Sequence, residues 1–154
     1  QKNIEVDALE ISPVFCDIMQ KRGVKNVLNE NIFSYSGKKY ETILLLMNGI
    51  GISGSLDNCE LLLTHLKILL TENGKIFIDS ADIIELAGGS PEDYGEGYYG
   101  EIEYQISYKK KVDQPFPWLF IDFDTLTEIA EDCGLKCKLI LKGPNNDFLA
   151  ELSF

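Results

Sequence analysis

The pattern of apolar and polar positions predicts a strand, a loop, a helix and a second strand at the centre of the chain. Residues 43–47 are an apolar run of strand length, and residues 55–70 repeat apolar side chains at helical spacing. A loop rich in glycine and asparagine separates them at 48–54, and a turn at 72–74 precedes a short apolar run at 76–78. This order predicts a parallel βαβ unit with both strands buried.

In an open α/β sheet, ligands bind beyond the carboxyl ends of the parallel strands. For this central unit, those ends fall at residues 47–54 and 79–82. We therefore expect functional residues in these two segments.

The residues before this unit repeat the same order of elements. Residues 4–11 and 24–28 each indicate a strand. Between them, Ser12 and the proline after it are typical of an N-cap and a first helical position, and Gly23 is typical of a helix end. The N-terminal part therefore predicts a second βαβ unit, whose first strand ends in an acid.

The C-terminal part predicts antiparallel structure. Residues 85–100 are rich in glycine and indicate a long loop that could close over a substrate as a lid. Residues 101–109 alternate apolar and polar side chains, as a half-exposed strand does, and residues 118–123 could pair with them after a turn at 114–117.

A helix and a hairpin are expected to end the chain. Thr125 and Glu128 fit a capping box, which predicts that the helix starts there. The sequence GPNND separates strand-like residues 138–141 from 148–154, as in a β-hairpin. The whole chain, 1–154, is thus expected to be one α/β domain, in which residues 85–123 form a loop and an antiparallel strand insertion.

Charge and cysteine content narrow the expected partners. The net charge of −11, from 25 acidic and 14 basic side chains, repels phosphate backbones, so we expect no nucleic-acid partner. No apolar run is long enough to cross a membrane, so we expect no membrane partner. Cys16, Cys59 and Cys133 fall on apolar helical positions and Cys137 completes no zinc motif, so we expect free thiols, no metal and a cytoplasmic location.

Three glycines of the central loop suggest a nucleotide site. Gly49, Gly51 and Gly54 match the spacing G-x-G-x-x-G, whose glycines let a pyrophosphate approach a helix N-terminus in dinucleotide-binding proteins. The helix is expected to begin only at Ser55, and a complete βαβ unit precedes the motif, which weakens this interpretation. An NAD(P) site, a loop of turn-forming glycines and a loop lining another nucleoside cofactor all stay open.

Two polar residues follow the strands of the N-terminal unit. Glu10 could accept hydrogen bonds from both hydroxyls of a ribose, or it could face water or cap the helix after Ser12. Asn31 could recognise an adenine edge through its amide, or it could form a turn. Spacing alone favours neither role for Glu10 and favours the turn for Asn31.

Four segments of the sequence resemble the class I S-adenosylmethionine-dependent methyltransferases, and within them bacterial proteins that act on small molecules. The segments are VDALEIS, NENIF, YETILLLMNGIG and LLTENGKIFIDSAD, and the resemblance runs from Ile4 to Asp82. It implies a Rossmann-like three-layer fold with a mostly parallel sheet and an antiparallel C-terminal hairpin. It also implies S-adenosyl-L-methionine as the cofactor and methyl transfer to a small-molecule substrate as the activity.

The resemblance further implies how the N-terminal unit would hold the cofactor. Glu10 resembles the ribose-binding acid of the family, and Ile11 beside it would pack on the adenine. Asn31 would contact the adenine amino group, and Ile32 would offer its backbone amide.

The central unit would line the other end of the cofactor. By the same resemblance, Met47, Asn48 and Gly49 surround the methionine portion and the methyl group. No residue identifies itself as a catalytic base. Four residues lie where a substrate could enter, although their positions favour solvated loop residues instead: Asp79, Asp82, Tyr98 and Tyr99.

One part of the family pattern has no counterpart in this sequence. The first strand and glycine-rich loop of the family, which hold the methionine half of the cofactor, should precede Gln1, and the missing strand would lie at the centre of the sheet. We therefore interpret the chain as N-terminally truncated and expect it to bind the cofactor weakly or not at all. An NAD(P)-binding oxidoreductase domain and a non-catalytic α/β module that assembles with a partner stay open as alternatives, and a homo-oligomer is one form of such assembly.

Overall fold

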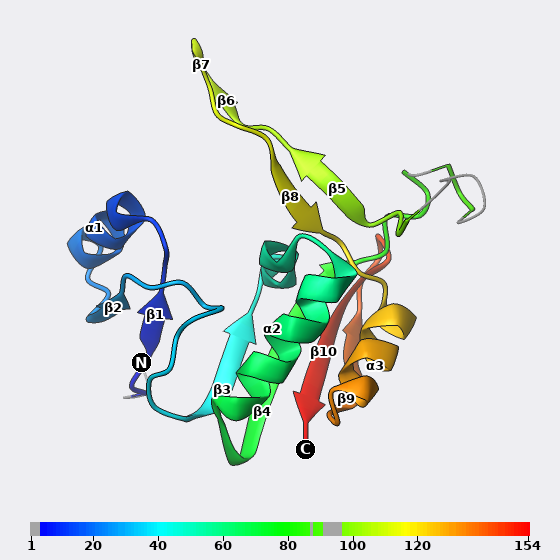
Figure 1. Ribbon diagram of the computed structural model, residues 1–154, viewed down its shortest axis with the longest axis horizontal. Coiled ribbons are helices and arrows are strands. Elements are labelled where there is room, and N and C mark those ends of the chain that lie inside the picture. Colours follow the sequence, from blue (N-terminus) through cyan, green and yellow to red (C-terminus); the bar gives the residue numbers. More distant parts are fainter. Residues whose placement is uncertain (1–3, 87, 91–96) are drawn as a thin grey trace. The chain divides into compact units, whose positions relative to one another are not determined.

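The computed structural model describes residues 4–86, 88–90 and 97–154 (Figure 1). The protein is α/β, as the sequence predicts, and falls into two compact units, of which the first ends at Lys38 and the second begins at Lys39. A two-stranded sheet organises the first unit and a four-stranded sheet organises the second. One domain spanning the whole chain stays a prediction.

The N-terminal unit is the βαβ unit that the sequence predicts. Strands β1 (Asp7–Leu9) and β2 (Asn26–Leu28) pair in parallel and are joined through helix α1 (Pro13–Lys21). Ser12 caps α1, because its side chain accepts a hydrogen bond from a backbone N–H of the first turn. Gly23 follows the helix with a φ of 91°, a conformation that glycine adopts without strain. Both strands are shorter than their apolar runs, with three residues each.

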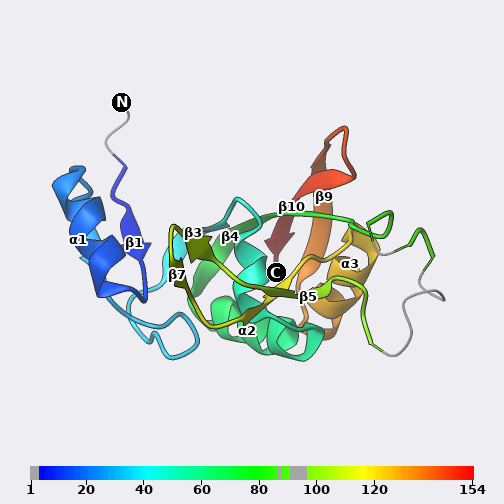
Figure 2. The same cartoon turned by 90° about the horizontal axis from the view of Figure 1, so that it is seen from above.

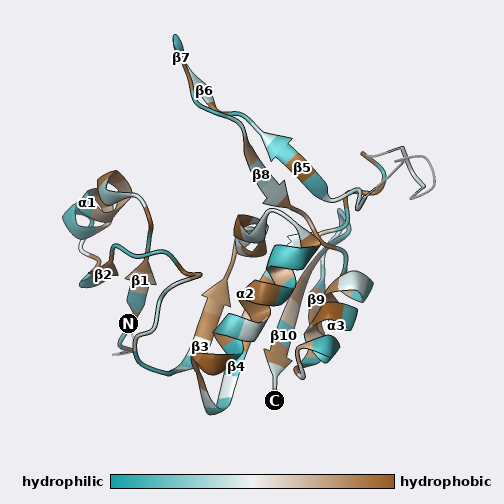
Figure 3. Ribbon diagram, viewed as in Figure 1, coloured by the Kyte–Doolittle hydropathy of each residue, from teal (hydrophilic) through white to brown (hydrophobic). Residues whose placement is uncertain are grey.

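The second unit contains the predicted central βαβ unit and the C-terminal hairpin in one sheet. Its strands are β3 (Tyr40–Leu45), β4 (Leu70–Ala81), β9 (Lys136–Lys142) and β10 (Asp147–Ser153), in the order β3-β4-β10-β9. β3 and β4 are parallel, whereas β10 runs antiparallel to both β4 and β9. Figure 3 shows β3 mostly in the colour of hydrophobic residues, and its last three residues, 43–45, belong to the apolar run in the sequence.

Two helices of the second unit cover the same face of this sheet (Figure 2). They are α2 (Leu56–Ile68) and α3 (Phe123–Asp132). Successive side chains of β4 and β10 point alternately to the covered and the uncovered face, as the pleat of a strand requires. The fully buried side chains of the covered face include Ile76, Ile78, Ala150 and Leu152, and those of the two helices include Leu62, Leu63, Leu66 and Leu126.

An antiparallel two-stranded ribbon, residues 101–119, extends from the second unit, and we call it the β-arm (Figure 1). β5 (Glu101–Tyr104) pairs with β8 (Phe116–Leu119), and further out β6 (Ser107–Tyr108) pairs with β7 (Lys111–Val112). The strand expected at 101–109 is therefore interrupted.

The partner strand and the turn of the β-arm lie elsewhere than expected. The turn predicted at 114–117 is wrong, because the chain reverses at the tip, where Lys109 has a φ of 56°. The partner strand begins at Phe116 because Tyr104 lies opposite Phe116 and its ring contacts Phe116 and Trp118. Such cross-strand aromatic pairs stabilise one register over others.

Two local predictions in the second unit are wrong for identifiable reasons. The residues predicted to form a turn at 72–74 are part of β4. The register of β4 against β3 shifts there, since Tyr40 lies opposite Leu70 but Thr42 lies opposite Lys75. Helix α3 is capped by Asp122, because its carboxylate accepts the backbone N–H of Thr125. The helix therefore starts earlier than a cap at Thr125 would allow.

The structure describes one of the two predicted loops completely and the other only in part. The predicted loop at 48–54 contains a short 3-10 helix, η1 (Gly49–Ser53). The predicted lid at 85–100 falls in part on residues 87 and 91–96, which lie outside the described residues.

Candidate functional site

Asn48 joins the carboxyl ends of β3 and β4. Its backbone N–H donates to Oδ1 of Asp79 at 3.0 Å, and its side-chain Oδ1 accepts from the hydroxyl of Ser80 at 2.8 Å. Its Nδ2 donates to the carbonyl oxygen of Leu119 at 3.1 Å, at the base of the β-arm. The segments 47–54 and 79–82 therefore meet at one edge of the sheet, as the sequence predicts.

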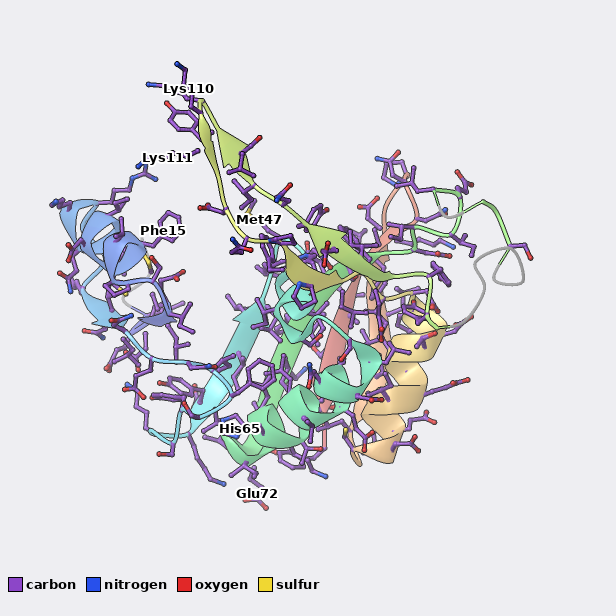
Figure 4. All side chains as sticks on the ribbon, turned by 45° about the horizontal axis from the view of Figure 1, so that its top comes forward. Phe15, Met47, His65, Glu72, Lys110 and Lys111 are labelled. Atoms are coloured by element: carbon purple, nitrogen blue, oxygen red, sulfur yellow. The ribbon has the colours of Figure 1, made fainter. Side chains whose placement is uncertain are left out.

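The loop after β3 has an unusual backbone. Met47 and Asn48 have φ values of 60° and 54°, in the left-handed region that side chains other than glycine rarely occupy. The hydrogen bonds of Asn48 hold this conformation, because they fix its main chain and its side chain at once. The result is that the Met47 side chain is 91% exposed at the edge of the sheet (Figure 4). Consecutive strained residues are common at functional sites.

The glycines of the G-x-G-x-x-G sequence have packing roles in this structure. A Cβ at Gly51 would overlap the indole of Trp118, and one at Gly54, whose φ is 73°, would meet Pro117 at 3.0 Å. Both residues let strand β8 approach η1 closely.

The N-terminus of α2 is also occupied by protein groups. The N–H of Leu56 donates to Oε1 of Glu101 at 2.8 Å, and the N–H of Asn58 donates to the hydroxyl of Ser55 at 3.2 Å. A pyrophosphate in a dinucleotide site would need such free N–H groups. This arrangement weighs against the NAD(P) interpretation.

Two tyrosines and two aspartates form a cluster beyond the end of β4, which we call the Tyr–Asp cluster: Tyr98, Tyr99, Asp82 and Asp122. The Tyr98 hydroxyl donates to Oδ2 of Asp122 at 2.7 Å and accepts from the Asp122 N–H at 2.9 Å. The Tyr99 hydroxyl donates to Oδ1 of Asp82 at 2.8 Å. The four residues line a pocket of about 420 Å³ together with Ile84, Gly97 and Thr125. The structure thus brings together three of the four residues expected where a substrate enters.

Burial and hydrogen bonding set the protonation of this cluster. Burial raises the pKa of Tyr98, and burial together with the hydrogen bond to Asp82 raises the pKa of Tyr99 well above its ordinary value of 10.0. Both phenols therefore stay protonated and act as donors. Burial alone would raise the pKa of Asp122, but hydrogen bonds from Thr125 and the two tyrosines lower it below its ordinary value of 3.8. Asp122 is therefore a carboxylate at neutral pH.

Glu10 lies at the carboxyl edge of the first unit. Its Oε1 accepts the N–H of Ser12 at 2.7 Å, so the carboxylate supports the start of α1, as one of the two sequence interpretations has it. Its backbone carbonyl accepts from Nδ2 of Asn29 at 2.9 Å, and the same amide donates to the carbonyl of Ile11. Among the described residues, Oε2 of Glu10 has no hydrogen-bond donor. One oxygen is therefore left to bind a ligand.

The neighbouring candidates of the first unit are on its surface. Oδ1 of Asn31 accepts the N–H of Phe33 at 2.9 Å, which is the turn that the spacing favours. Ile32 is half-buried, and the side chain of Ile11 is 65% exposed, so it could cover an apolar ring. A cofactor site that these residues share with Met47, Asn48 and Gly49 stays a prediction.

Sequence reasoning missed two residues that position others. The first is Asn29, which follows β2 and whose side-chain amide donates to the carbonyl oxygens of Glu10 and Ile11, after β1. The second is Asp122, which caps α3 in place of the predicted Thr125, and aspartate is itself a preferred N-cap residue. The four cysteines are free, as expected.

The described residues contain no group of three or more histidine, cysteine, aspartate or glutamate side chains that could hold a metal ion. Within the same residues, no helix combines the length and the apolar character that crossing a membrane would require.

Comparison with known proteins finds similar proteins among the solved structures. No protein-family model and no curated protein matches the sequence. Among solved structures, a SAM-dependent methyltransferase from Bacteroides fragilis, in complex with S-adenosyl-L-homocysteine, is 42% identical with a TM-score of 0.86, covering 97% of this chain. This chain spans 62% of that protein.

More distant structures share the fold. The methyltransferase CcbJ from Streptomyces caelestis has a TM-score of 0.69 at 10% identity, over 97% of this chain and 74% of its own. The sugar N-methyltransferase KedS8 from Streptoalloteichus has a TM-score of 0.64 at 11% identity, over 94% and 69%. The expected fold is confirmed, and so is the resemblance to the class I S-adenosylmethionine-dependent methyltransferases that the sequence predicts.

Proposed function

We propose that this protein takes part in methyl transfer from S-adenosyl-L-methionine to a small-molecule acceptor. The observation that carries the proposal is the 42% identity over nearly the whole chain to a methyltransferase whose structure holds S-adenosyl-L-homocysteine. When bound, the cofactor supplies a methyl group on a positively charged sulfur. The contribution of the protein is then to align the acceptor with that group and to exclude water.

The first unit offers groups suited to the nucleoside half of the cofactor. Oε2 of Glu10 can accept from ribose hydroxyls, since Oε1 is held by Ser12. Ile11 presents an exposed apolar side chain for the adenine, and Asn31 and Ile32 can contact its edge through a side-chain amide and a backbone N–H.

The second unit offers the loop for the methionine half. Met47 would contact the methionine half through its side chain, and Gly49 through its main chain. The backbone N–H and the side-chain amide of Asn48 are already hydrogen-bonded, so this residue acts as a positioning residue that shapes the loop.

We place the acceptor in the pocket of the Tyr–Asp cluster. Asp82 and Asp122 supply negative charge, and the tyrosine hydroxyls supply donors that hold both carboxylates in place. Such a pocket suits a small acceptor with an amine or hydroxyl group, and one solved neighbour is named as a sugar N-methyltransferase. Asp79 does not line this pocket, and its Oδ1 accepts the backbone N–H of Asn48. We expect the protein to act in the cytoplasm.

Calorimetry of the full-length gene product with S-adenosyl-L-homocysteine tests the proposal. The variant Glu10→Gln keeps the hydrogen bond to Ser12 through its amide oxygen but removes the charge. It should weaken binding by about ten- to a hundredfold, the size expected for hydrogen bonds to a charged group. Glu30→Gln is the control, since Glu30 is an exposed acid near the same edge.

Two results would count against the proposal. The first is a thermal shift with NAD(H) and none with S-adenosyl-L-homocysteine, which would favour an oxidoreductase domain. The second is no shift with either ligand, together with a stable oligomer, which would favour a non-catalytic module.

A further inference from the structure

The pocket of the Tyr–Asp cluster has one carboxylate oxygen that the described protein leaves unused. Oδ1 of Asp82 accepts two hydrogen bonds, from the Tyr99 hydroxyl at 2.8 Å and from the backbone N–H of Ile84 at 2.9 Å. Among the described residues, Oδ2 of Asp82 accepts none. Because two donors fix Oδ1, the carboxylate is held in one orientation, and Oδ2 is left for a ligand of the pocket that Asp82 lines.

The other polar side chains of this lining are already engaged. The hydroxyls of Tyr98 and Thr125 donate to Oδ2 of Asp122 at 2.7 and 2.6 Å, and the Tyr99 hydroxyl lies 3.3 Å from the same oxygen. Burial raises the pKa of both tyrosines, so their hydroxyls keep the protons that they donate. Each hydroxyl has only one proton to donate. The described side chains of the pocket therefore offer a ligand an acceptor and no unused donor.

The charge of the lining is negative and unbalanced. In the described part of the chain, the pocket is lined by Asp82 and Asp122 and by no basic residue, and neither aspartate forms an ion pair. Both also line a neighbouring pocket of about 180 Å³, to which Lys142 adds a positive charge and Asp124 a negative one. The partial positive charge at the N-terminus of α3 is opposed by Asp122 itself, which caps the helix. The pocket therefore attracts positive groups and repels negative ones.

We infer that the methyl acceptor is an amine, which binds in its protonated form and donates an N–H to Oδ2 of Asp82. This assignment rests on the proposed function, which makes the bound molecule the acceptor. An ammonium group matches the pocket twice, because it is positively charged and only donates hydrogen bonds. An alcohol can donate to the same oxygen but lacks the charge, and a carboxylate adds a negative charge. The ammonium must release one proton to water before transfer, because the new bond needs the nitrogen lone pair.

Three ring compounds that differ in one group test this assignment: cyclohexylamine, cyclohexanol and cyclohexanecarboxylate. NMR titration of the full-length gene product at neutral pH, without cofactor, gives a dissociation constant for each compound. The ring signals of Tyr98 and Tyr99 show whether the compound binds in this pocket. The amine should bind about tenfold more tightly than the alcohol, because a charged hydrogen bond is stronger than a neutral one, and the carboxylate should bind most weakly.

Asp82→Asn tests the assigned oxygen. Its amide oxygen can keep the hydrogen bonds from Tyr99 and Ile84, while an uncharged NH₂ group takes the place of Oδ2. The affinity for the amine should fall by about tenfold or more, whereas the affinity for the alcohol should change by less than about twofold. Asp132→Asn is the matched control, because it removes an exposed carboxylate of α3 that does not line the pocket. It should leave all three affinities unchanged.

The outcomes decide between this assignment and its alternatives. Selectivity for the amine that is lost in Asp82→Asn and kept in Asp132→Asn supports it. It is overturned if none of the compounds binds, if the alcohol or the carboxylate binds as tightly as the amine, or if Asp82→Asn keeps the selectivity. The ranking by the unaltered protein decides even if Asp82→Asn does not fold. A protein that binds S-adenosyl-L-homocysteine but shows no selectivity for the amine would keep the proposed function and lose only this inference.

Discussion

The side-chain oxygen of Asn48 accepts a hydrogen bond of 2.8 Å from the hydroxyl of Ser80. Ser80 is 3% exposed, and its oxygen also accepts the N–H of Ile121 at 3.0 Å. One buried hydroxyl thereby connects the loop after β3, the end of β4 and the segment that follows the β-arm. The left-handed backbone at Met47 and Asn48 depends on this connection.

Replacing Ser80 by alanine should destabilise the second unit. The change leaves Oδ1 of Asn48 and the N–H of Ile121 without their partner, and each buried unpaired group costs about 1–3 kcal/mol. Urea unfolding should therefore show a loss in the free energy of unfolding of about 2 kcal/mol or more. Ser107→Ala, on an exposed serine of the β-arm, should change it by less than about 0.5 kcal/mol. Equal effects of both changes would contradict this role of Ser80.

Replacing Gly51 by alanine should displace Trp118. The added Cβ would overlap the indole, so the tryptophan must move away from η1 toward water. Trp118 is the single tryptophan of the chain, so its emission spectrum should shift to the red and its quenching by acrylamide should increase.

The control for this prediction is the neighbouring glycine of the same sequence motif. At Gly49, a Cβ would meet only Leu45, at an ordinary 3.4 Å, so Gly49→Ala should leave the emission nearly unchanged. If both variants gave the same spectrum as the unaltered protein, the close approach of β8 to η1 would be wrong.

The thiol of Cys59 should be the least reactive in the folded protein. Burial raises its pKa to about 12, with a smaller contribution from Cys133, and its side chain is fully buried. Because the thiolate is the reactive form, alkylation at pH 8 should reach Cys59 only after unfolding. Cys133 and Cys137, which are partly exposed, should be labelled earlier, and peptide mapping by mass spectrometry can rank the sites. Rapid labelling of Cys59 in native buffer would contradict its burial.

The sequence predicts well the elements that depend on neighbouring residues along the chain. Helical spacing of leucines located α2, Ser12 and its proline located the start of α1, and GPNND located the β9–β10 hairpin. In each case the physical cause is local: a cap satisfies an N–H within one turn, and a tight turn sets a register. The edge where we expect ligands to bind follows from the parallel pairing of β3 with β4.

Features that depend on contacts between distant residues were not predictable in the same way. The register of the β-arm is set by Tyr104 against Phe116 and Trp118, and alternation along one strand does not reveal that pairing. The Tyr–Asp cluster joins Tyr99 to Asp82, 17 residues apart in sequence. The glycine spacing suggested a nucleotide loop. In the structure, residue 51 must be glycine because the indole of Trp118, far along the chain, leaves no room for a Cβ.

The stability that Asp122 provides should depend on pH in a defined direction. Its carboxylate accepts the Thr125 hydroxyl at 2.6 Å, the Thr125 N–H at 2.9 Å and the Tyr98 hydroxyl at 2.7 Å. These bonds lower its pKa in the folded protein below the ordinary value of 3.8 despite its burial. The unfolded chain therefore binds the proton more tightly, so the contribution is fully present above pH 3.8 and is lost as the pH falls through the lower pKa of the folded state.

Asp122→Asn removes the charge of the carboxylate but keeps the helix cap, because asparagine caps a helix about as well as aspartate. The amide can accept at one atom only, so the donors around it lose a partner, and we expect a loss of about 1–3 kcal/mol in the free energy of unfolding at pH 7. The difference from the unaltered protein should shrink as the pH falls below 3.8, because the carboxylate becomes protonated. Asp124→Asn removes an exposed charge from the same first turn of α3 and should cost less than about 1 kcal/mol. Urea unfolding between pH 3 and pH 7 measures both, and a difference for Asp122→Asn that grew toward low pH would show that the carboxylate does not stabilise the fold.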